Sequence, residues 1–242
     1  MSNFHRLQTI QAPLFSALRF SFIAQDCVLC GAASGDAMMC APCEAALPRL
    51  SSFCESCAVA LPRAGICGRC QRRPPAFDRA IAALEYRFPV DRVVHRFKYS
   101  ADLAMGRWLS LQLAERVRGE SLPDLLVAPP LTGARLRERG FNQALEIAKV
   151  VGRRLGVRCD LSGLVKVRET SPQPGLGRAR RRANLRRAFR CDLALEGRNV
   201  ALVDDVMTTG ATADALARVL KAAGAARVSV WAVARTPDPA SD

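Results

Sequence analysis

Apolar residues in the later part of the chain gather in short runs that alternate with segments of helical spacing. Four runs rich in alanine, leucine and β-branched residues are typical of buried strands: 80–88, 125–128, 199–203 and 227–234. Between them, apolar positions recur every three or four residues, from 91 to 117, late in 131–156 and from 211 to 224. The alternation predicts an α/β fold with a parallel sheet, helices on both faces and ligands beyond the carboxyl ends of the strands.

The stretch from Asn199 to Arg218 has the most distinctive chemistry. An apolar strand ends at Asp204 and Asp205, and a loop of threonine, glycine and small residues leads into a helix. The loop comprises Val206, Met207, Thr208, Thr209, Gly210, Ala211 and Thr212. A helix start leaves backbone N–H groups unpaired in a positive potential, which predicts an anion site. The carboxylates suit vicinal sugar hydroxyls, directly or partly through a divalent cation, so the stretch suggests a sugar phosphate ligand. The alternative is an ordinary strand–turn–helix unit.

Arginines crowd two other segments. Arg135, Arg137 and Arg139 lie between a rigid turn at Pro129–Pro130 and the next helix, either as anion ligands or as a solvated helix start. Residues 168–190 contain eight arginines and one acid, and their prolines and glycines predict a long irregular segment. Its arginines either meet pyrophosphate or a nucleic-acid backbone, or they only make a solubilising basic loop.

Eight of the ten cysteines form four CxxC pairs between residues 27 and 70. The pairs are Cys27 with Cys30, Cys40 with Cys43, Cys54 with Cys57, and Cys67 with Cys70. Each pair places two thiolates on one tight turn, and two pairs supply the ligands of a tetrahedral zinc site. One or two structural zinc ions are therefore predicted, with neighbouring and cross-braced pairing both compatible with the spacing. Disulfides, a redox role and an iron–sulfur cluster are the alternatives.

Composition narrows the class of partner. The 242 residues include 36 basic and 22 acidic ones, and the net charge of +14 favours phosphates, nucleic acids or anionic surfaces. No apolar run is long enough to span a membrane and no signal peptide is recognised, which predicts a cytoplasmic protein. The pair Pro74–Pro75 predicts a boundary between a part at 1–75, with a helix ahead of the cysteines, and a part at 76–242.

Aromatic and basic residues interleave from Tyr86 to Tyr99. This pattern suits the stacking of single-stranded bases, but a half-buried strand and helix with a basic face produce it more commonly. His95 within it has no partner motif nearby and is predicted to be structural.

Several motifs together resemble known families. VALVDDVMTTGAT, at residues 200–212, resembles the phosphoribosyl pyrophosphate (PRPP) signature of type I phosphoribosyltransferases. The order of four cysteine pairs, HRFKY at 95–99, RLRERGFNQ at 135–143, SPQPGLGRARRRANLRRAF at 171–189 and VDDVMTTGAT resembles the ComF family, with its ComFC and GntX-like members. Proteins of that family join a zinc-finger module to a phosphoribosyltransferase domain and are linked to natural transformation.

The resemblance implies a type I phosphoribosyltransferase-like sheet with flanking helices, a Cys-rich zinc module before it, and binding of PRPP with Mg²⁺. In that family pattern Asp204 and Asp205 are the catalytic pair, and the loop after them binds the 5′-phosphate of PRPP. The pyrophosphate group would meet Pro129, Pro130, Leu131 and Thr132 with the three nearby arginines. The arginine-rich segment resembles a flexible lid, with Gln173, Arg178, Arg181 and Arg182 facing PRPP.

Two functions are compatible with these features. The first is a PRPP-dependent transferase that acts on imported single-stranded DNA, or in nucleotide metabolism, alongside DNA-uptake proteins. The second is a non-catalytic, zinc-containing adaptor that binds single-stranded DNA and uses the transferase fold as a PRPP sensor or platform. The sequence shows no reader of an acceptor base, so it leaves the acceptor open.

Overall fold

The computed structural model describes residues 25–167 and 188–238. Contacts group the chain into two units, Met1–Ala45 and Ala46–Asp242, whose structures are taken separately. The helix expected ahead of the cysteines lies outside the described residues, and the domain boundary after Pro75 stays a prediction. Within the described ranges, no helix combines the length and the apolar character that a bilayer crossing requires.

The described part of the first unit is a small ribbon. Strands β1 (Gln25–Asp26) and β2 (Ala33–Gly35) pair in antiparallel fashion, and helix α1 (Ala41–Ala45) follows them. Between residues 25 and 45, only Cys27 and Met39 are buried. With so little apolar core, we expect this ribbon to need a metal ion held by its cysteines for stability.

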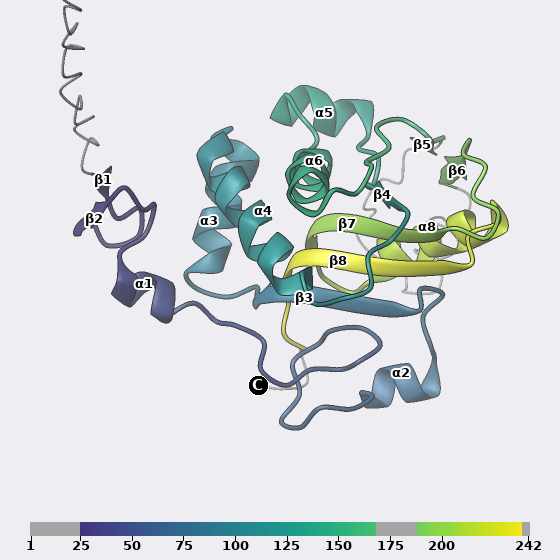
Figure 1. Ribbon diagram of the computed structural model, residues 1–242, viewed down its shortest axis with the longest axis horizontal. Helices are drawn as coiled ribbons and strands as arrows, with labels where there is room; N and C mark the ends of the chain where they lie inside the picture. The colour runs from purple at the N-terminus through teal and green to yellow at the C-terminus, as the bar shows by residue number, and fades with distance from the viewer. Residues whose placement is uncertain (1–24, 168–187, 239–242) are drawn as a thin grey trace, which may run out of the picture. The chain divides into compact units, whose positions relative to one another are not determined.

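The larger unit is built on a four-stranded parallel sheet of order β3-β8-β7-β4 (Figure 1). The strands are β3 (Arg79–Glu85), β4 (Leu125–Val127), β7 (Asn199–Met207) and β8 (Arg227–Arg235). Their apolar side chains are buried on both faces, as is usual for parallel strands covered by helices. The predicted α/β architecture is confirmed, although the first strand ends at Glu85 rather than at residue 88.

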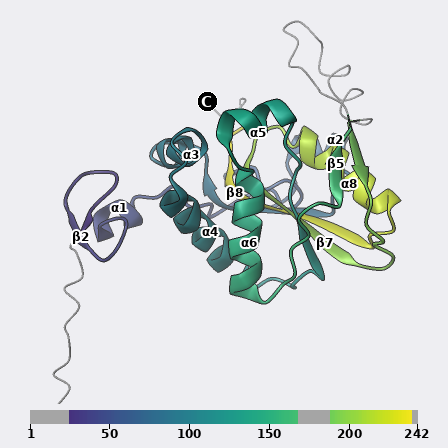
Figure 2. The same cartoon turned by 90° about the horizontal axis from the view of Figure 1, so that it is seen from above.

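Helices cover both faces of this sheet. Helices α3 (Val90–Tyr99), α4 (Leu103–Val117) and α6 (Gln143–Leu155) lie alongside one another on one face, and α8 (Ala211–Ala222) packs on the other (Figure 2). The helical pattern predicted from 91 to 117 is divided between α3 and α4. The reason is local, because Ala101 adopts a φ of 50° and the Asp102 carboxylate caps α4 by accepting from the Met105 N–H.

The second cysteine segment belongs to the larger unit. Its backbone meets strand β3, where Arg49 bridges Leu84 and the Ala80 N–H donates to the Ser56 carbonyl at 2.9 Å. Helix α2 (Gly68–Arg72) closes the segment. Its buried residues share one core with α8 and with β7 and β8, so this part of the chain is packed into the sheet's own interior.

A short antiparallel pair borders the predicted lid. Strands β5 (Leu164–Lys166) and β6 (Phe189–Cys191) pair through Val165 and Arg190. The predicted lid residues Gln173, Arg178, Arg181 and Arg182 lie between these strands in sequence, outside the described residues.

Candidate functional site

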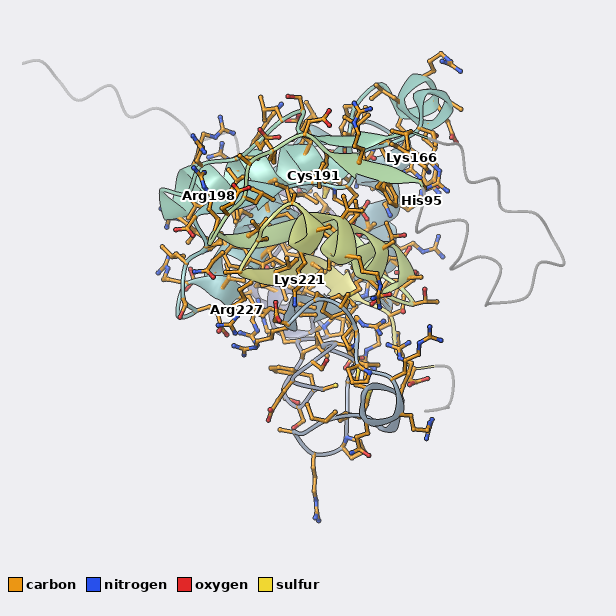
Figure 3. All side chains as sticks on the ribbon, turned by 90° about the vertical axis from the view of Figure 1, so that its right-hand side faces the viewer. His95, Lys166, Cys191, Arg198, Lys221 and Arg227 are labelled. Carbon is orange, nitrogen blue, oxygen red and sulfur yellow. The ribbon has the colours of Figure 1, made fainter. Side chains whose placement is uncertain are left out.

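The acidic pair lies at the carboxyl end of the central strand β7. The strand runs through both acids to Met207, so their backbone is fixed by pairing with β8, with Asp204 opposite Ala232. Figure 3 shows Lys166 and His95 at this end of the sheet and Arg198 and Arg227, near the starts of β7 and β8, at the opposite end. Ligands of parallel sheets bind at the carboxyl ends of the strands, which is where the pair stands.

The two carboxylates have different surroundings. Lys98, from the last turn of α3, places its Nζ 2.9 Å from Asp205 Oδ2, and the two side chains are only 17% and 13% exposed. The Asp204 carboxylate instead accepts from the Asp205 N–H at 2.9 Å. Burial and the neighbouring Asp205 carboxylate raise the pKa of Asp204 to about 8. Near neutral pH, therefore, one carboxylate is held by a lysine and the other largely retains its proton.

The loop after β7 forms a compact turn at the start of α8. Gly210 adopts a φ of 75°, a left-handed conformation that favours glycine at this position. The Asp214 N–H donates to the Gly210 carbonyl at 2.8 Å and begins the helix. Thr208, Thr209 and Thr212 are exposed, with the Thr209 hydroxyl accepting from the Ala211 N–H at 3.3 Å. The turn thus presents hydroxyl groups at a helix N-terminus.

A cavity of about 540 Å³ opens in front of the acidic pair. Its walls come from the end of β7 and the loop after it, the segment after β4, the end of α3, the start of α6, and the strands β5 and β6. Its polar lining side chains are Lys98, Thr132, Arg135, Arg139, Asn142, Gln143, Lys166, Asp204, Asp205, Thr208 and Thr212. Cationic and hydroxyl donors therefore face two carboxyl groups across one open, polar space.

The structure brings together most, but not all, of the predicted site residues. The lining of the cavity includes Pro129, Pro130, Leu131, Thr132, Arg135, Arg139, Asp204, Asp205, Val206, Thr208 and Thr212. Met207, Thr209, Gly210 and Ala211 instead line a cavity of about 40 Å³ behind the loop. Arg137 lines neither cavity.

The position of Arg137 has a simple geometric cause. The segment that the sequence placed between turn and helix is itself a short helix, α5 (Gly133–Arg139), capped by the Thr132 hydroxyl. Residues four apart share a helix face, so Arg135 and Arg139 both reach the cavity while Arg137, two positions along, points elsewhere. Asn142 also lines the cavity, but its side chain already has partners in the protein. Its amide donates to the Pro129 carbonyl at 3.0 Å, and its oxygen caps α6.

Sequence reasoning missed six residues that line the cavity: Lys98, Ala134, Gln143, Ala144, Lys166 and Phe189. Lys98 and Gln143 belong to the motifs HRFKY and RLRERGFNQ, which was the available signal. Their proximity to Asp205 depends on how α3 and α6 pack on the sheet, and no spacing in the sequence encodes it.

Two donors in the cavity wall have no partner among the described residues. Gln143 is 1% exposed, and its side-chain oxygen accepts from Arg139 Nη1 at 3.1 Å. This bond fixes the orientation of the amide and leaves Gln143 Nε2 buried without an acceptor. Arg139 Nε is also buried without an acceptor. Both atoms have almost no accessible surface, so they lie behind the cavity wall and are part of its buried polar support.

The aromatic and basic stretch divides between core and surface. Phe97 is fully buried and packs 5.4 Å from the Phe141 ring, as the commoner interpretation predicted. Tyr99 is 55% exposed, with the His95 ring 4.7 Å away and the Arg139 guanidinium 5.3 Å from its ring centre. Tyr99 therefore forms an exposed aromatic face flanked by nitrogen groups, next to residues that line the cavity.

The eight clustered cysteines form two sets of four. Cys27, Cys30, Cys40 and Cys43 make one, and Cys54, Cys57, Cys67 and Cys70 the other, with the sulfur atoms of each set within 4.8 Å of one another. Neighbouring pairs therefore close each site, and the cross-braced alternative is not adopted. Sulfur separations of 3.6 Å for Cys30 and Cys40 and 3.8 Å for Cys57 and Cys67 match the edge, about 3.8 Å, of a tetrahedron with zinc–sulfur bonds of about 2.3 Å. Both sets fit a structural zinc ion.

Fold and sites together define a class of protein: a parallel α/β sheet with a polar cavity in front of an acidic pair, on a chain that also carries two four-cysteine sets that fit zinc. Comparison with known proteins agrees. Residues 21–71 match the family model of the double zinc ribbon domain. The chain is 34% identical over 205 residues to the DNA utilization protein YhgH of Escherichia coli, which covers 82% of this chain and 90% of that protein. It is 32% identical over 179 residues to Competence protein F of Haemophilus influenzae, which covers 70% and 78%. The chain belongs to this family, the ComF family.

Some solved structures show a distant likeness. One is a purine phosphoribosyltransferase from Pyrococcus horikoshii, 18% identical with a TM-score of 0.35, covering 64% of this chain and 78% of that one. Another is the glutamine PRPP amidotransferase from B. subtilis, 22% identical with a TM-score of 0.37, covering 53% and 26%.

Proposed function

We propose that this protein binds PRPP with Mg²⁺ in the 540 Å³ cavity and catalyses phosphoribosyl transfer there. The observation that carries the proposal is the composition of that cavity. It places a carboxyl pair, a threonine-rich helix start and two arginines around one space, which are the groups that ribose hydroxyls, a monophosphate and a pyrophosphate respectively require.

Each group has a role in this proposal. Asp204 and Asp205 hold the vicinal hydroxyls of the ribose, while Thr208, Thr212 and the N–H groups of residues 208 to 210 hold the 5′-phosphate. Arg135 and Arg139, with residues 129–132, hold the pyrophosphate. Mg²⁺ bound with PRPP would neutralise charge on the departing pyrophosphate.

The proposed transfer is a substitution at C1 of the ribose. The bond from C1 to the pyrophosphate oxygen breaks and the pyrophosphate departs with the electron pair, while the lone pair of a nucleophile forms a new bond to C1. The nucleophile then loses a proton to solvent or to a nearby base. Fixed positive groups aimed at the departing oxygens would lower the barrier, because they stabilise charge that develops only in the transition state.

The names of the relatives suggest a setting. A DNA utilization protein and a competence protein are among them, so we propose that the site serves the handling of imported single-stranded DNA or its nucleotides. This role would be cytoplasmic and would involve contacts with DNA-uptake proteins.

A second candidate function is direct binding of single-stranded DNA without catalysis. The exposed Tyr99 beside Arg139 favours it, because an aromatic face next to a cation can stack a base. The net charge of +14 would supply the attraction to the backbone.

Calorimetric titration with PRPP and Mg²⁺ tests the first proposal. The double substitution Asp204→Asn and Asp205→Asn should weaken binding by about 100-fold or more, because both carboxyl groups that would hold the ribose hydroxyls are lost. Asp192→Asn is the matched control, since this exposed carboxylate pairs only with Arg190 among the described residues and lies outside the cavity lining. Unchanged affinity in the double variant would end the proposal.

Catalysis and DNA binding need their own assays. Release of pyrophosphate from PRPP across nucleobases and related amines identifies an acceptor if transfer occurs. Titration with short single-stranded DNA at two salt concentrations tests the adaptor, which predicts salt-sensitive binding that survives the double aspartate change but weakens in Tyr99→Ala.

A further inference from the structure

Arg235, the last residue of β8, joins the second cysteine cluster to the loop after β7. Its side chain is 2% exposed. Its Nε donates to the Cys57 carbonyl at 3.0 Å, and its Nη1 donates to the Met207 carbonyl at 3.0 Å and to the Thr208 carbonyl. One buried guanidinium thus bonds the metal-binding turn and the proposed phosphate loop at the same time.

Arg69 makes a parallel connection from the other side. It stands on α2 between the ligands Cys67 and Cys70, and its Nη2 lies 3.6 Å from the Cys57 sulfur. Its Nη1 donates to the Thr209 carbonyl at 3.4 Å. A third contact is close by, where the Ala76 N–H donates to Asp214 in the first turn of α8 at 2.7 Å.

These contacts determine which way the loop faces. Three successive carbonyls, those of residues 207 to 209, are directed at guanidinium groups on the side of the cysteine cluster. In a trans peptide the N–H points opposite to the C=O, so the N–H groups of residues 208 to 210 are directed away from the cluster. Carbonyls facing an anion would repel it, whereas the observed arrangement turns donors toward it and places two cations behind the loop.

We infer that the zinc site of Cys54, Cys57, Cys67 and Cys70 positions the phosphate loop, with Arg69 and Arg235 as the positioning residues. The inference rests on the proposed function only in naming a phosphate as the ligand. Zinc would hold the Cys57 turn and α2 together, and these two elements hold the guanidinium groups in register with the loop carbonyls. Loss of zinc from this site should therefore loosen the loop, whereas loss from the site of Cys27, Cys30, Cys40 and Cys43 should not.

Substitutions at Arg69 test the coupling in protein that retains both zinc ions. Arg69→Gln should keep two equivalents of zinc and a cooperative unfolding transition, yet hydrogen exchange at residues 208–212 should be about tenfold faster, because a hydrogen bond to the loop worth about 1.4 kcal/mol is lost. PRPP affinity should fall by a similar factor. Arg72→Gln, an exposed arginine on the same short helix, is the matched control and should change neither. Wild-type exchange and affinity in Arg69→Gln would overturn the inference.

Arg235→Lys is the second variant, since a single ammonium cannot span the Cys57 and Met207 carbonyls as the guanidinium does. It should show faster loop exchange than Arg69→Gln, and unchanged exchange would count against the inference. The exchange measurement needs no ligand. If the wild-type protein fails to bind PRPP, the proposed function fails while exchange still decides whether the zinc site holds the loop.

Coupling between two sites is reciprocal, which gives an independent test. PRPP with Mg²⁺ should slow the release of one zinc equivalent to a chelator and leave the other unaffected. In Cys30→Ser with Cys43→Ser, the remaining zinc should be the protected one. Equal release with and without PRPP, in protein that demonstrably binds PRPP, would contradict the coupling.

Discussion

The two four-cysteine sites are alike in sequence spacing and different in surroundings. Every cysteine of the second site lies 27 residues after its counterpart in the first: 27 and 54, 30 and 57, 40 and 67, 43 and 70. The backbone repeats as well. The N–H of Cys27 donates to the Ala32 carbonyl at 2.7 Å, and that of Cys54 donates to the Val59 carbonyl at 2.8 Å. Both turns contain a residue with positive φ at the same position, 74° at Gly31 and 56° at Ala58.

Burial separates the two sites. All four cysteines of the second site are at most 6% exposed, whereas Cys30 is exposed and Cys40 and Cys43 are only half-buried in the first. Arg69, which reaches the loop after β7, occupies the position that Pro42 holds in the first site. Ligand spacing therefore sets the metal geometry, while the residues between the ligands decide what each zinc ion supports.

The largest difference between the two sites should appear when their cysteine ligands are replaced. Cys57→Ser with Cys70→Ser should unfold the larger unit, because a structural zinc site contributes on the order of 10 kcal/mol and a domain has only about 5–15 kcal/mol in total. Cys30→Ser with Cys43→Ser should leave its circular dichroism and urea midpoint unchanged. Comparable losses in the two variants would show that burial does not separate the sites.

Exchanging the residues at the equivalent helix position is the next test. Arg69→Pro copies the first site into the second at the second position of α2, where proline is tolerated because its missing N–H would be unpaired. It should retain zinc and weaken PRPP binding about tenfold through loss of one charged hydrogen bond. Pro42→Arg should have no effect on PRPP affinity, and a decrease in this variant would undermine the comparison.

Side chains packed around the cysteine ligands should show a smaller difference in stability between the two sites. Val59 is 1% exposed in the core of the larger unit, whereas its counterpart Ala32 is exposed. Val59→Ala should lower the free energy of unfolding by about 2 kcal/mol through lost burial and a residual cavity. Ala32→Val should change it by less than about 0.5 kcal/mol. Chemical denaturation of both variants measures the pair.

The contribution of the acidic pair to stability can be distinguished from that of the two zinc sites by varying the pH. The pKa of Asp204 is raised from 3.8 in the unfolded chain to about 8 in the folded protein, so the folded state holds a proton that the unfolded state has lost between these values. Stability from this group therefore falls as pH rises from about 4 to 8. Asp204→Asn should gain about 1 kcal/mol over the wild type for each pH unit from 6 to 7.5. A constant difference over that range would refute the assignment of the proton.

Much of the larger unit could be predicted because its strands are apolar on both faces and its helices have regular spacing. The acidic pair and the threonine loop were equally visible, since they are contiguous in the sequence. Contacts between residues far apart in the chain could not be predicted from the sequence. Lys98 meets Asp205 only because α3 ends beside β7, and Arg235 is an ordinary strand-end arginine until the fold places it between Cys57 and Met207.

Two further features could not be derived from the sequence, for physical reasons. Arg137 was grouped with Arg135 and Arg139 because a loop has no fixed periodicity, whereas the observed helix orients every second residue elsewhere. The pairing of the cysteine turns stayed open because ligand spacing permits both schemes, whereas the structure brings neighbouring pairs together.

The burial of Arg235 has a consequence for how this protein can be divided or recombined. A fragment that begins after Pro75 would lack the Cys57 carbonyl, leave a buried charge without one of its acceptors and expose the edge of β3 that meets Arg49. The larger unit begins at Ala46, so we expect a chain that starts there to keep its fold. The second ribbon is not a detachable module, because its buried residues and the Cys57 carbonyl are part of the interior of the larger unit.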